Sequence, residues 1–286
     1  LGINLPARDQ GGSDILTLYD FGNSVCCQKV RITLCEKGQD WEAVSVDLFK
    51  GEQYDPNYLK MNPKGVVPTL VHDGRAVTES TLICEYIDSV FPDPPLAPSD
   101  PLLRSRMQFW SKLVDEGLFE GVAAISFSAM FRERMKNAPE EIRQARFRNI
   151  GDPRRRDRMK STLEHGIHSP YVLHAIYVYE KAFKLLEETL AEGGPWILGD
   201  NPTLADIALM PFTARLDYLG LIDIWLTDRP RVRDWWAMAK EWPSYQRGLA
   251  DLVTDAEIAE MHAHGPKLTD DITGLLGSLR DGSWNS

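Results

Sequence analysis

Cysteine is scarce in this sequence, and long apolar runs are missing. The four cysteines (Cys26, Cys27, Cys35 and Cys84) lack the spacing of a metal site, so we expect free thiols, no metal and a cytoplasmic protein. No apolar stretch is long enough to span a bilayer, which predicts no integral membrane segment. The first 14 residues have no apolar signal core, and we expect them to form a flexible lead-in.

Positive charge is also in deficit. The 286 residues contain 32 Lys and Arg against 42 Asp and Glu, which gives a formal net charge of -10 at pH 7. Such a chain would be repelled by nucleic acid and anionic membranes, so we expect neither as a main partner. The hydrophobic content of 43% is ample for a sizeable core in one or two domains.

Residues 14–92 predict a small mixed α/β domain in the order β-α-β-α-β-β-α. Residues 15–19 alternate apolar and polar side chains, and residues 42–47 give a second strand after an intervening helix. A right-handed crossover between these two strands makes them parallel. Two further short strands flank a turn at Asp73-Gly74, and a final helix follows them.

A proline-rich linker at residues 91–98 separates this domain from a second one. The pattern from 101 to 262 is helical throughout and predicts an all-α domain. Residues 132–169 form an arginine-rich insertion within it. We interpret the insertion as a lid or a partner-binding arm, and its arginines as a solvated, salt-bridged surface. Residues 263–286 are polar with few apolar anchors and are expected to be a C-terminal tail.

The predicted helix start at Glu79-Ser80 is a candidate binding site. Unpaired N–H groups at a helix N-terminus favour a carboxylate, and the Ser80 hydroxyl adds a donor there. Glu79 adds an anion suited to an ammonium group, so the pair fits an amino acid. Val67, which precedes Pro68 in a predicted cis bond, can pair its backbone with an extended peptide. A plain cis-proline hairpin followed by an ordinary helix cap explains the same residues.

These motifs resemble those of the glutathione S-transferase superfamily. The stretches that carry the resemblance are VVP (66–68), the Glu79-Ser80 helix start, TLADI (203–207), and Ser24 placed six residues before Val30. The resemblance implies a thioredoxin-like first domain, an all-helical second domain and glutathione as co-substrate. A narrower resemblance is to the bacterial lignin-degrading β-etherases of the β-S-selective type. It is carried by YDFGNS (19–24), EKG (36–38), KGEQ (50–53), NPKGVVP (62–68), HDGRAVTESTLICEYIDSVFP (72–92) and KLVDE (112–116).

The resemblance implies that Ser24 contacts the glutathione thiol. A hydroxyl donor at a helix N-terminus would favour the thiolate over the thiol. Asn23 in the same turn is the second candidate for this role, and Cys26 is the third. Serine at this position favours conjugation or ether cleavage over disulfide reduction. A simple N-cap is the alternative role for Ser24.

The same resemblance implies which residues bind the rest of glutathione. Gln53 would hold the glycyl end, and Lys50 would add positive charge beside the glycyl carboxylate. Val67 would pair with the backbone of the cysteinyl residue. Glu79 and Ser80 would hold the γ-glutamyl end.

We expect the second substrate between the two domains, on the helical side. Aromatic side chains there could stack on a phenolic ring, and a histidine could polarise a carbonyl or donate to a leaving phenolate. Core packing and a solvated histidine are the alternatives. The candidates are Phe119, Phe127, Phe131, Tyr171, Tyr177 and His168.

The sequence therefore predicts a glutathione-dependent β-etherase that releases a phenol from a lignin-derived aromatic ether. One alternative is a zeta-like isomerase, because the order Ser24-Val25-Cys26 resembles the Ser-Ser-Cys motif of that class. The other alternative is a glutathione-binding module without activity. A dimer of identical or different chains is expected, because proteins of this pattern usually form two-fold dimers.

Overall fold

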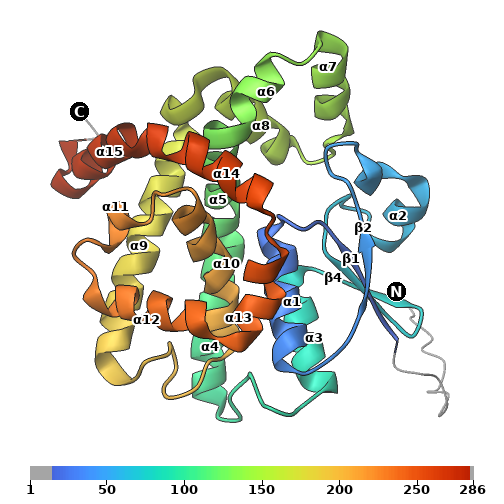
Figure 1. The fold of residues 1–286 in the computed structure, drawn as a ribbon, viewed down its shortest axis with the longest axis vertical. Coiled ribbons are helices and arrows are strands. Elements are labelled where there is room, and N and C mark those ends of the chain that lie inside the picture. Colours follow the sequence, from blue (N-terminus) through green and yellow to red (C-terminus); the bar gives the residue numbers. More distant parts are fainter. Residues whose placement is uncertain (1–14, 284–286) are drawn as a thin grey trace.

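The computed structural model describes residues 15–283. The predicted lead-in (1–14) and the last three residues of the predicted tail lie outside this range. The chain forms a small sheet domain beside a larger helical domain (Figure 1). Helices α1 (Val25–Glu36) and α3 (Ser80–Val90) lie between the sheet and the other helices. This arrangement confirms the predicted fold class.

The sheet domain has four strands in the order β2-β1-β3-β4. β1 pairs in parallel with β2 and antiparallel with β3, and β3 pairs antiparallel with β4. The predicted order β-α-β-α-β-β-α is confirmed, with a 3-10 turn, η1, before the second helix. The remaining elements are β1 (Leu16–Asp20), β2 (Glu42–Ser45), η1 (Glu52–Tyr54), α2 (Pro56–Met61), β3 (Thr69–His72) and β4 (Arg75–Thr78).

The turn between β3 and β4 follows from its two residues. Asp73 has φ of 50° and Gly74 has φ of 76°. Two positive φ angles are what a two-residue type I′ hairpin requires, and Asp-Gly is among the pairs that tolerate them. The predicted hairpin is therefore confirmed, and it pairs His72 with Arg75.

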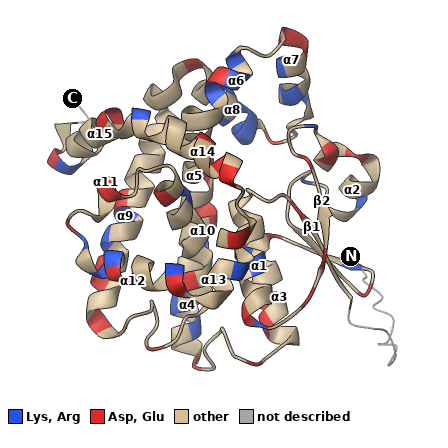
Figure 2. Ribbon diagram, viewed as in Figure 1, with Lys and Arg blue, Asp and Glu red and all other residues tan. Residues whose placement is uncertain are grey.

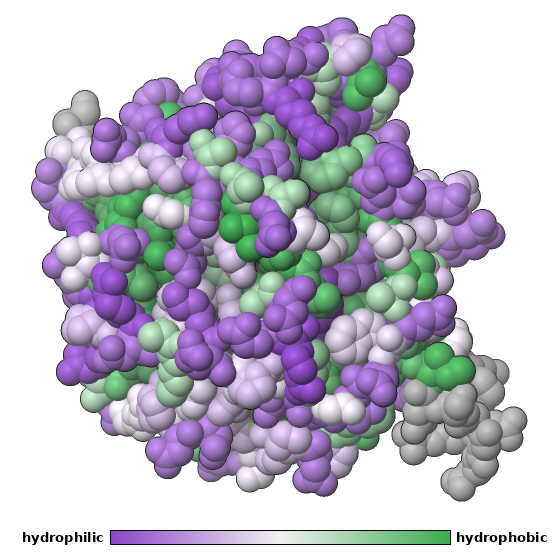
Figure 3. All heavy atoms as spheres, in the orientation of Figure 1, coloured by the Kyte–Doolittle hydropathy of each residue, from purple (hydrophilic) through white to green (hydrophobic). Residues whose placement is uncertain are grey.

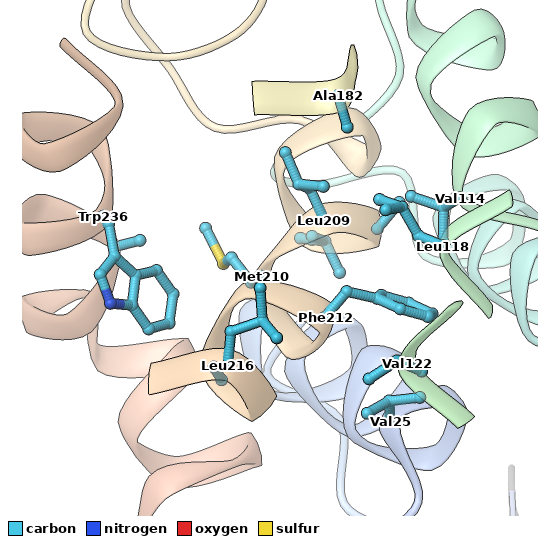
Figure 4. Packing of buried hydrophobic residues seen from close by; sticks show 14 of the residues in the cluster. Val25, Val114, Leu118, Val122, Ala182, Leu209, Met210, Phe212, Leu216 and Trp236 are labelled. Carbon is cyan, nitrogen blue, oxygen red and sulfur yellow. The ribbon is translucent and has the colours of Figure 1, made fainter. Parts of the chain in front are cut away.

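The helical domain is built around α10 (Leu204–Tyr218), which is buried on nearly all sides. Its side chains point toward surrounding helices in several directions (Figure 4). The neighbours are α1, α4 (Pro101–Leu113), α5 (Phe119–Ser126), α12 (Pro230–Glu241) and α14 (Asp255–His264). The long α9 (Pro170–Gly193) packs against α5 and α12. The remaining segments are α11 (Asp223–Leu226), α13 (Pro243–Gly248), η5 (Ala250–Leu252) and η6 (Gly265–Leu268).

A buried carboxylate fixes the start of α10. Asp206 accepts hydrogen bonds from the Thr203 backbone N–H at 2.9 Å, the Thr203 hydroxyl at 3.1 Å and the Trp235 indole N–H at 3.0 Å. It also accepts from the backbone N–H of Ile197 at 3.0 Å. Burial raises the pKa of Asp206, and these bonds oppose that rise. The capping box predicted at Thr203 is therefore present.

Two π-helical turns divide the helical run that begins with α4. These are η2 (Val114–Leu118) and η3 (Phe127–Phe131), on either side of α5. Each adds one residue to a helical turn and so shifts the face that the following residues present. The run ends with α6 (Arg132–Lys136).

The predicted insertion, residues 132–169, is mainly helical. After α6 it forms α7 (Glu140–Asn149), α8 (Pro153–His165) and the 3-10 turn η4 (Gly166–His168). Figure 1 shows α6 and α7 at the top of the molecule, on the side where the loop after β2 lies.

The expectation of few apolar anchors at the C-terminus was wrong for the residues described. Most of them form α15 (Thr269–Asp281), which packs on α9. Ile272 and Leu276 are buried there. These side chains are four residues apart and lie on one helix face, a pattern hidden among polar neighbours.

The two domains meet where α13 packs on α1. An added Cβ at Gly248 would lie 2.6 Å from the Ile32 backbone nitrogen and 2.9 Å from the Arg31 carbonyl carbon. Both atoms belong to the α1 backbone and cannot turn aside. The Gly248 carbonyl also accepts a hydrogen bond from the Arg31 Nε at 3.0 Å.

We expect Gly248→Ala to destabilise the protein because the extra methyl group would force α13 away from α1. Overpacking of this kind costs about 1–3 kcal/mol. Urea unfolding followed by circular dichroism measures the change. Gly277→Ala is the control, since nothing lies within 4 Å of a Cβ there and alanine favours helix. Equal stability of the two variants would contradict the close packing.

Candidate active site

The turn between β1 and α1 carries the first candidate residue. Ser24 is the N-cap of α1, and its Oγ accepts a hydrogen bond from the Cys27 N–H at 3.4 Å. The hydroxyl oxygen acts as acceptor in this bond, so the hydroxyl proton remains for another acceptor. The capping role and a role as donor are therefore compatible in one side chain.

Arg31, nearly two turns into α1, holds this turn in place from the helix side. Its guanidinium pairs with Asp20 Oδ2 at 2.5 Å and donates to the Gly22 carbonyl at 2.8 Å. The third bond is the one to Gly248, so Arg31 ties the turn to the helical domain. The Arg31 side chain is only 2% exposed, and hydrogen bonds shielded from water are stronger than exposed ones. These bonds therefore fix the conformation of the turn.

Arg215 of α10 holds the other side of the turn. It donates to the Asn23 carbonyl at 2.6 Å and to the Asn23 side-chain oxygen, and a third bond reaches the Ser126 hydroxyl at 3.1 Å. Burial lowers the pKa of Arg215 to about 10, so it stays charged at neutral pH. Because Arg215 occupies the amide oxygen of Asn23, the amide NH2 end is left as a donor.

The predicted cis bond between Val67 and Pro68 is present. Val67 lies before β3, and its backbone is hydrogen-bonded to no other described residue. The preceding carbonyl of Val66 is fixed by the Tyr58 hydroxyl at 2.6 Å and the Asn62 amide at 2.9 Å. The backbone N–H and C=O of Val67 are thus left without a partner in the described part of the chain.

The start of α3 presents the next two candidates. Glu79 is its N-cap residue, with φ of 68°, and its exposed carboxylate pairs with Lys64 at 2.8 Å. Ser80 is 8% exposed, and its hydroxyl interacts with the Cys26 thiol. A positive φ in a residue other than glycine is uncommon and often marks functional sites.

Gln53 is buried at the end of the loop after β2. Its amide nitrogen is 3.5 Å from the Leu48 carbonyl, and its Oε1 has no hydrogen-bond partner among residues 15–283. A buried acceptor without a donor is costly, so this atom suits a ligand N–H. Lys50 is mostly exposed and pairs with Asp47 at 3.3 Å.

Three aromatic rings pack together at the turn between β1 and α1. Phe21 packs on Phe49 with ring centroids 5.8 Å apart, and Phe49 packs on Phe131 at 5.4 Å. Phe21 and Phe49 come from the sheet domain, whereas Phe131 belongs to η3. Phe127 lies one turn earlier on η3 and is buried. The three packed rings therefore bridge the two domains.

The other substrate candidates do not pack against the rings of Phe21, Phe49 and Phe131. Tyr171 donates its hydroxyl to Asp157, which raises its pKa. The ring of Tyr177 lies near His174 and Lys181 of the same helix. Phe119 and His168 are exposed, and no described ring packs on either.

Sequence reasoning missed Phe21, Phe49 and Arg215. A signal existed for the two phenylalanines, because β1 and β2 are parallel and their carboxyl ends meet at one edge of the sheet. Phe21 and Phe49 follow those two strands. No local pattern marks Arg215, which looks like any polar residue near the end of a helix.

None of the four thiols is activated. Burial raises the pKa of Cys26, and the nearby Lys29 only partly offsets this. Burial also raises the pKa of Cys27, Cys35 and Cys84. A raised pKa keeps the Cys26 thiol protonated at neutral pH, and its role as the third candidate for contacting the glutathione thiol stays a prediction.

Two classes of site are absent from the described part of the chain. Residues 15–283 contain no cluster of three or more histidine, cysteine or carboxylate side chains placed to hold a metal ion. In the same range, no helix is both long and apolar enough to cross a membrane.

Comparison with known proteins gives consistent matches. Residues 18–95 match the family described as "Glutathione S-transferase, N-terminal domain", and residues 154–236 match "Glutathione S-transferase, C-terminal domain". Glutathione S-transferase 1 of Dianthus caryophyllus is 31% identical over 199 residues, which are 68% of this chain and 75% of that protein.

Two relatives bear on the reaction. Protein LigF of Sphingobium sp. is 41% identical over 141 residues, 48% of this chain and about half (55%) of LigF. The crystal structure of the β-etherase LigF from Sphingobium sp. strain SYK-6 superposes with a TM-score of 0.72 at 29% identity, covering 82% of this chain and 98% of LigF. Maleylacetoacetate isomerase of Pseudomonas aeruginosa is 27% identical over 236 residues, 81% of this chain and 94% of that protein.

We expect slow alkylation of Cys26 by iodoacetamide at neutral pH, because its raised pKa keeps the thiol protonated. The rate should rise steadily as pH increases to 9 and beyond, since the thiolate fraction grows. Mass spectrometry of labelled peptides measures it, with Cys26→Ser identifying the contribution of the three buried thiols. A rate that is already constant between pH 7 and 8 would contradict the raised pKa.

Proposed function

The chain belongs to the glutathione S-transferase family, and from this premise we propose that it is a glutathione-dependent β-etherase acting on lignin-type α-keto aryl ethers. The observation that carries the proposal is the similarity to LigF, which extends over 98% of the LigF chain. The catalytic turn with its serine hydroxyl and the adjoining aromatic rings supports it. The glutathione S-transferase relatives act with glutathione, which is the co-substrate here.

The proposed reaction exchanges one bond for another at the carbon next to the ketone. Glutathione supplies the sulfur nucleophile, a carbon–sulfur bond forms and the carbon–oxygen bond to the aryl group breaks. The proton of the thiol ends on the released phenol, so no oxidant or reductant is needed. The chain must lower the pKa of the thiol and align the ether for displacement.

Ser24 is proposed as the donor to sulfur. Its oxygen already accepts from α1, so its proton points to a separate acceptor. The N-terminus of α1 adds positive potential at the same place. Asn23 has a free amide NH2 end, held in orientation by Arg215, and is proposed as an auxiliary donor.

Five residues are proposed to bind the rest of glutathione. Ser80 at the start of α3 meets the α-carboxylate of the γ-glutamyl residue, and Glu79 meets its ammonium group. The open backbone of Val67 pairs with the cysteinyl residue. Gln53 brings its unpartnered oxygen to a ligand N–H at the glycyl end, where exposed Lys50 adds charge.

The aryl group of the ether is proposed to lie against Phe21, Phe49 and Phe131. These rings bridge the domains next to the turn that holds Ser24. Offset or edge-to-face stacking of an aromatic substrate would position the carbon–oxygen bond relative to the sulfur. Phe127 serves as buried support for this wall rather than as a contact.

An isomerase of the zeta type is the second candidate function. The match to maleylacetoacetate isomerase covers 94% of that protein, and the order Ser24-Val25-Cys26 resembles the Ser-Ser-Cys motif, with valine in place of the second serine. Isomerisation returns glutathione unchanged, whereas ether cleavage consumes it. Measuring total free glutathione during turnover therefore separates the two reactions.

We expect glutathione-dependent release of a fluorescent phenol from an α-keto aryl ether. Ser24→Ala should lower the rate by about 10²–10³, because one donor to the developing charge is lost, and by less if Asn23 compensates. Ser24→Thr keeps a hydroxyl and a capping residue and is the matched control. Turnover of a maleyl-type acid without phenol release from either enantiomer would replace the proposal by the isomerase.

We expect Ser80→Ala to weaken glutathione binding by about tenfold, because a hydrogen bond to a charged group contributes about 1.5–3 kcal/mol. Isothermal titration calorimetry measures the affinity. Ser89→Ala on the same helix is the control, since the Ser89 hydroxyl is exposed and bonds only to the Glu85 carbonyl. The assignment of α3 fails if both variants bind glutathione as tightly as the unchanged protein.

A further inference from the structure

Two arginines of the insertion lie over a ring of the sheet domain. The Arg134 guanidinium carbon on α6 is 5.4 Å from the centroid of Phe49, and that of Arg146 on α7 is 5.7 Å from it. Phe49 is 45% exposed and lies in the loop after β2. The insertion thus contacts the sheet domain through two positively charged side chains.

The charge of these two arginines is not balanced locally. Within residues 15–283, neither guanidinium forms an ion pair or a hydrogen bond. Neighbouring arginines do have carboxylate partners: Arg143 pairs with Glu140 and Arg158 pairs with Glu120 at 3.2 Å. Arg134 and Arg146 thus belong to the arginines of the insertion that have no carboxylate partner in the described part of the chain.

The surroundings of Arg146 are positive as well. Burial and the nearby Arg155 lower its pKa, and Tyr54 is the group that opposes this. Blue ribbon marks Lys and Arg along α6, α7 and α8 in Figure 2, although the whole chain is acidic. An anion at this place would relieve the repulsion between like charges.

Stacking leaves the binding edges of a guanidinium available. A guanidinium that rests on an aromatic ring uses its flat face, and its N–H groups point outward in the plane. Those N–H groups match the two oxygens of a carboxylate, which they can bind in a bidentate manner. Phe49 therefore acts as a platform that orients both arginines without consuming their donors.

The location of this pair connects it to the candidate active site. Phe49 packs on Phe21 and Phe131, the rings proposed to hold the aryl group. It also directly precedes Lys50, and Tyr54 beside Arg146 directly follows Gln53. In Figure 3 the surface over α6 and α7 is mainly hydrophilic, with more hydrophobic atoms below it in the middle of the face.

We propose that Arg134 and Arg146, stacked on Phe49, form a carboxylate-binding subsite at the outer end of the active site. Two carboxylates can reach a subsite placed there: the glycyl carboxylate of glutathione, or a carboxylate carried by the aromatic co-substrate. This inference rests on the proposed function for the identity of its ligands. Its test uses binding alone, so it stands even if ether cleavage is not observed.

The test compares full-length Arg134→Gln/Arg146→Gln with Arg148→Gln, a control on the exposed side of α7. Calorimetry measures four ligands: glutathione, its glycyl ethyl ester, S-benzylglutathione and S-(4-carboxybenzyl)glutathione. The ester lacks the glycyl carboxylate, and the two benzyl conjugates differ by one carboxylate on the aromatic ring. Circular dichroism confirms that each variant is folded, and Arg134→Gln alone provides a milder variant.

Either of two results supports the subsite. Loss of about tenfold in affinity for glutathione, with the ester unaffected, identifies the glycyl carboxylate as the ligand. An unchanged affinity for glutathione, with a tenfold smaller preference for the carboxybenzyl over the benzyl conjugate, identifies the co-substrate. Both effects should shrink in high salt. The proposal is overturned if all four affinities match those of Arg148→Gln. It is also overturned if glutathione and its ester weaken equally and the two benzyl conjugates weaken equally as well.

Discussion

Two buried arginines, Arg31 and Arg215, fix the turn that carries Ser24, and they connect this turn to the helical domain. Arg31 reaches the turn from α1 and bonds to Asp20 and Gly22, while Arg215 reaches it from α10 and bonds to Asn23. Both arginines also bond to the helical domain, at Gly248 and Ser126. A buried guanidinium must have its donors satisfied, so the turn and the domain interface fix one another.

The position of Arg215 depends in turn on the core around α10. That helix starts at a capping box sealed by Asp206, which also accepts the indole N–H of Trp235 from α12. Hydrophobic side chains then surround the helix on several sides (Figure 4). The buried helix α10 therefore positions Arg215, and Arg215 in turn positions the turn that carries the Ser24 hydroxyl.

The fold was predictable from the sequence because its signals are local. Alternating strands, the Asp73-Gly74 turn and the Thr203 cap each specify structure within a few residues. The tail and the aromatic group were harder for a physical reason. Ile272 and Leu276 become buried only through packing of α15 on α9, which lies far away in the sequence. Phe131 joins the aromatic group only because η3 places its ring against Phe49.

The interpretation of the arginines in the insertion changes once the structure shows their neighbours. As sequence, its arginines are a charged stretch that any solvated surface explains. In the structure Arg143 and Arg158 have carboxylate partners, whereas Arg134 and Arg146 have none among residues 15–283 and lie over Phe49 instead. Phe49, over which both lie, also packs on Phe21 in the turn that carries Ser24. The position of these two positive charges where the domains meet therefore supports the proposed carboxylate-binding subsite.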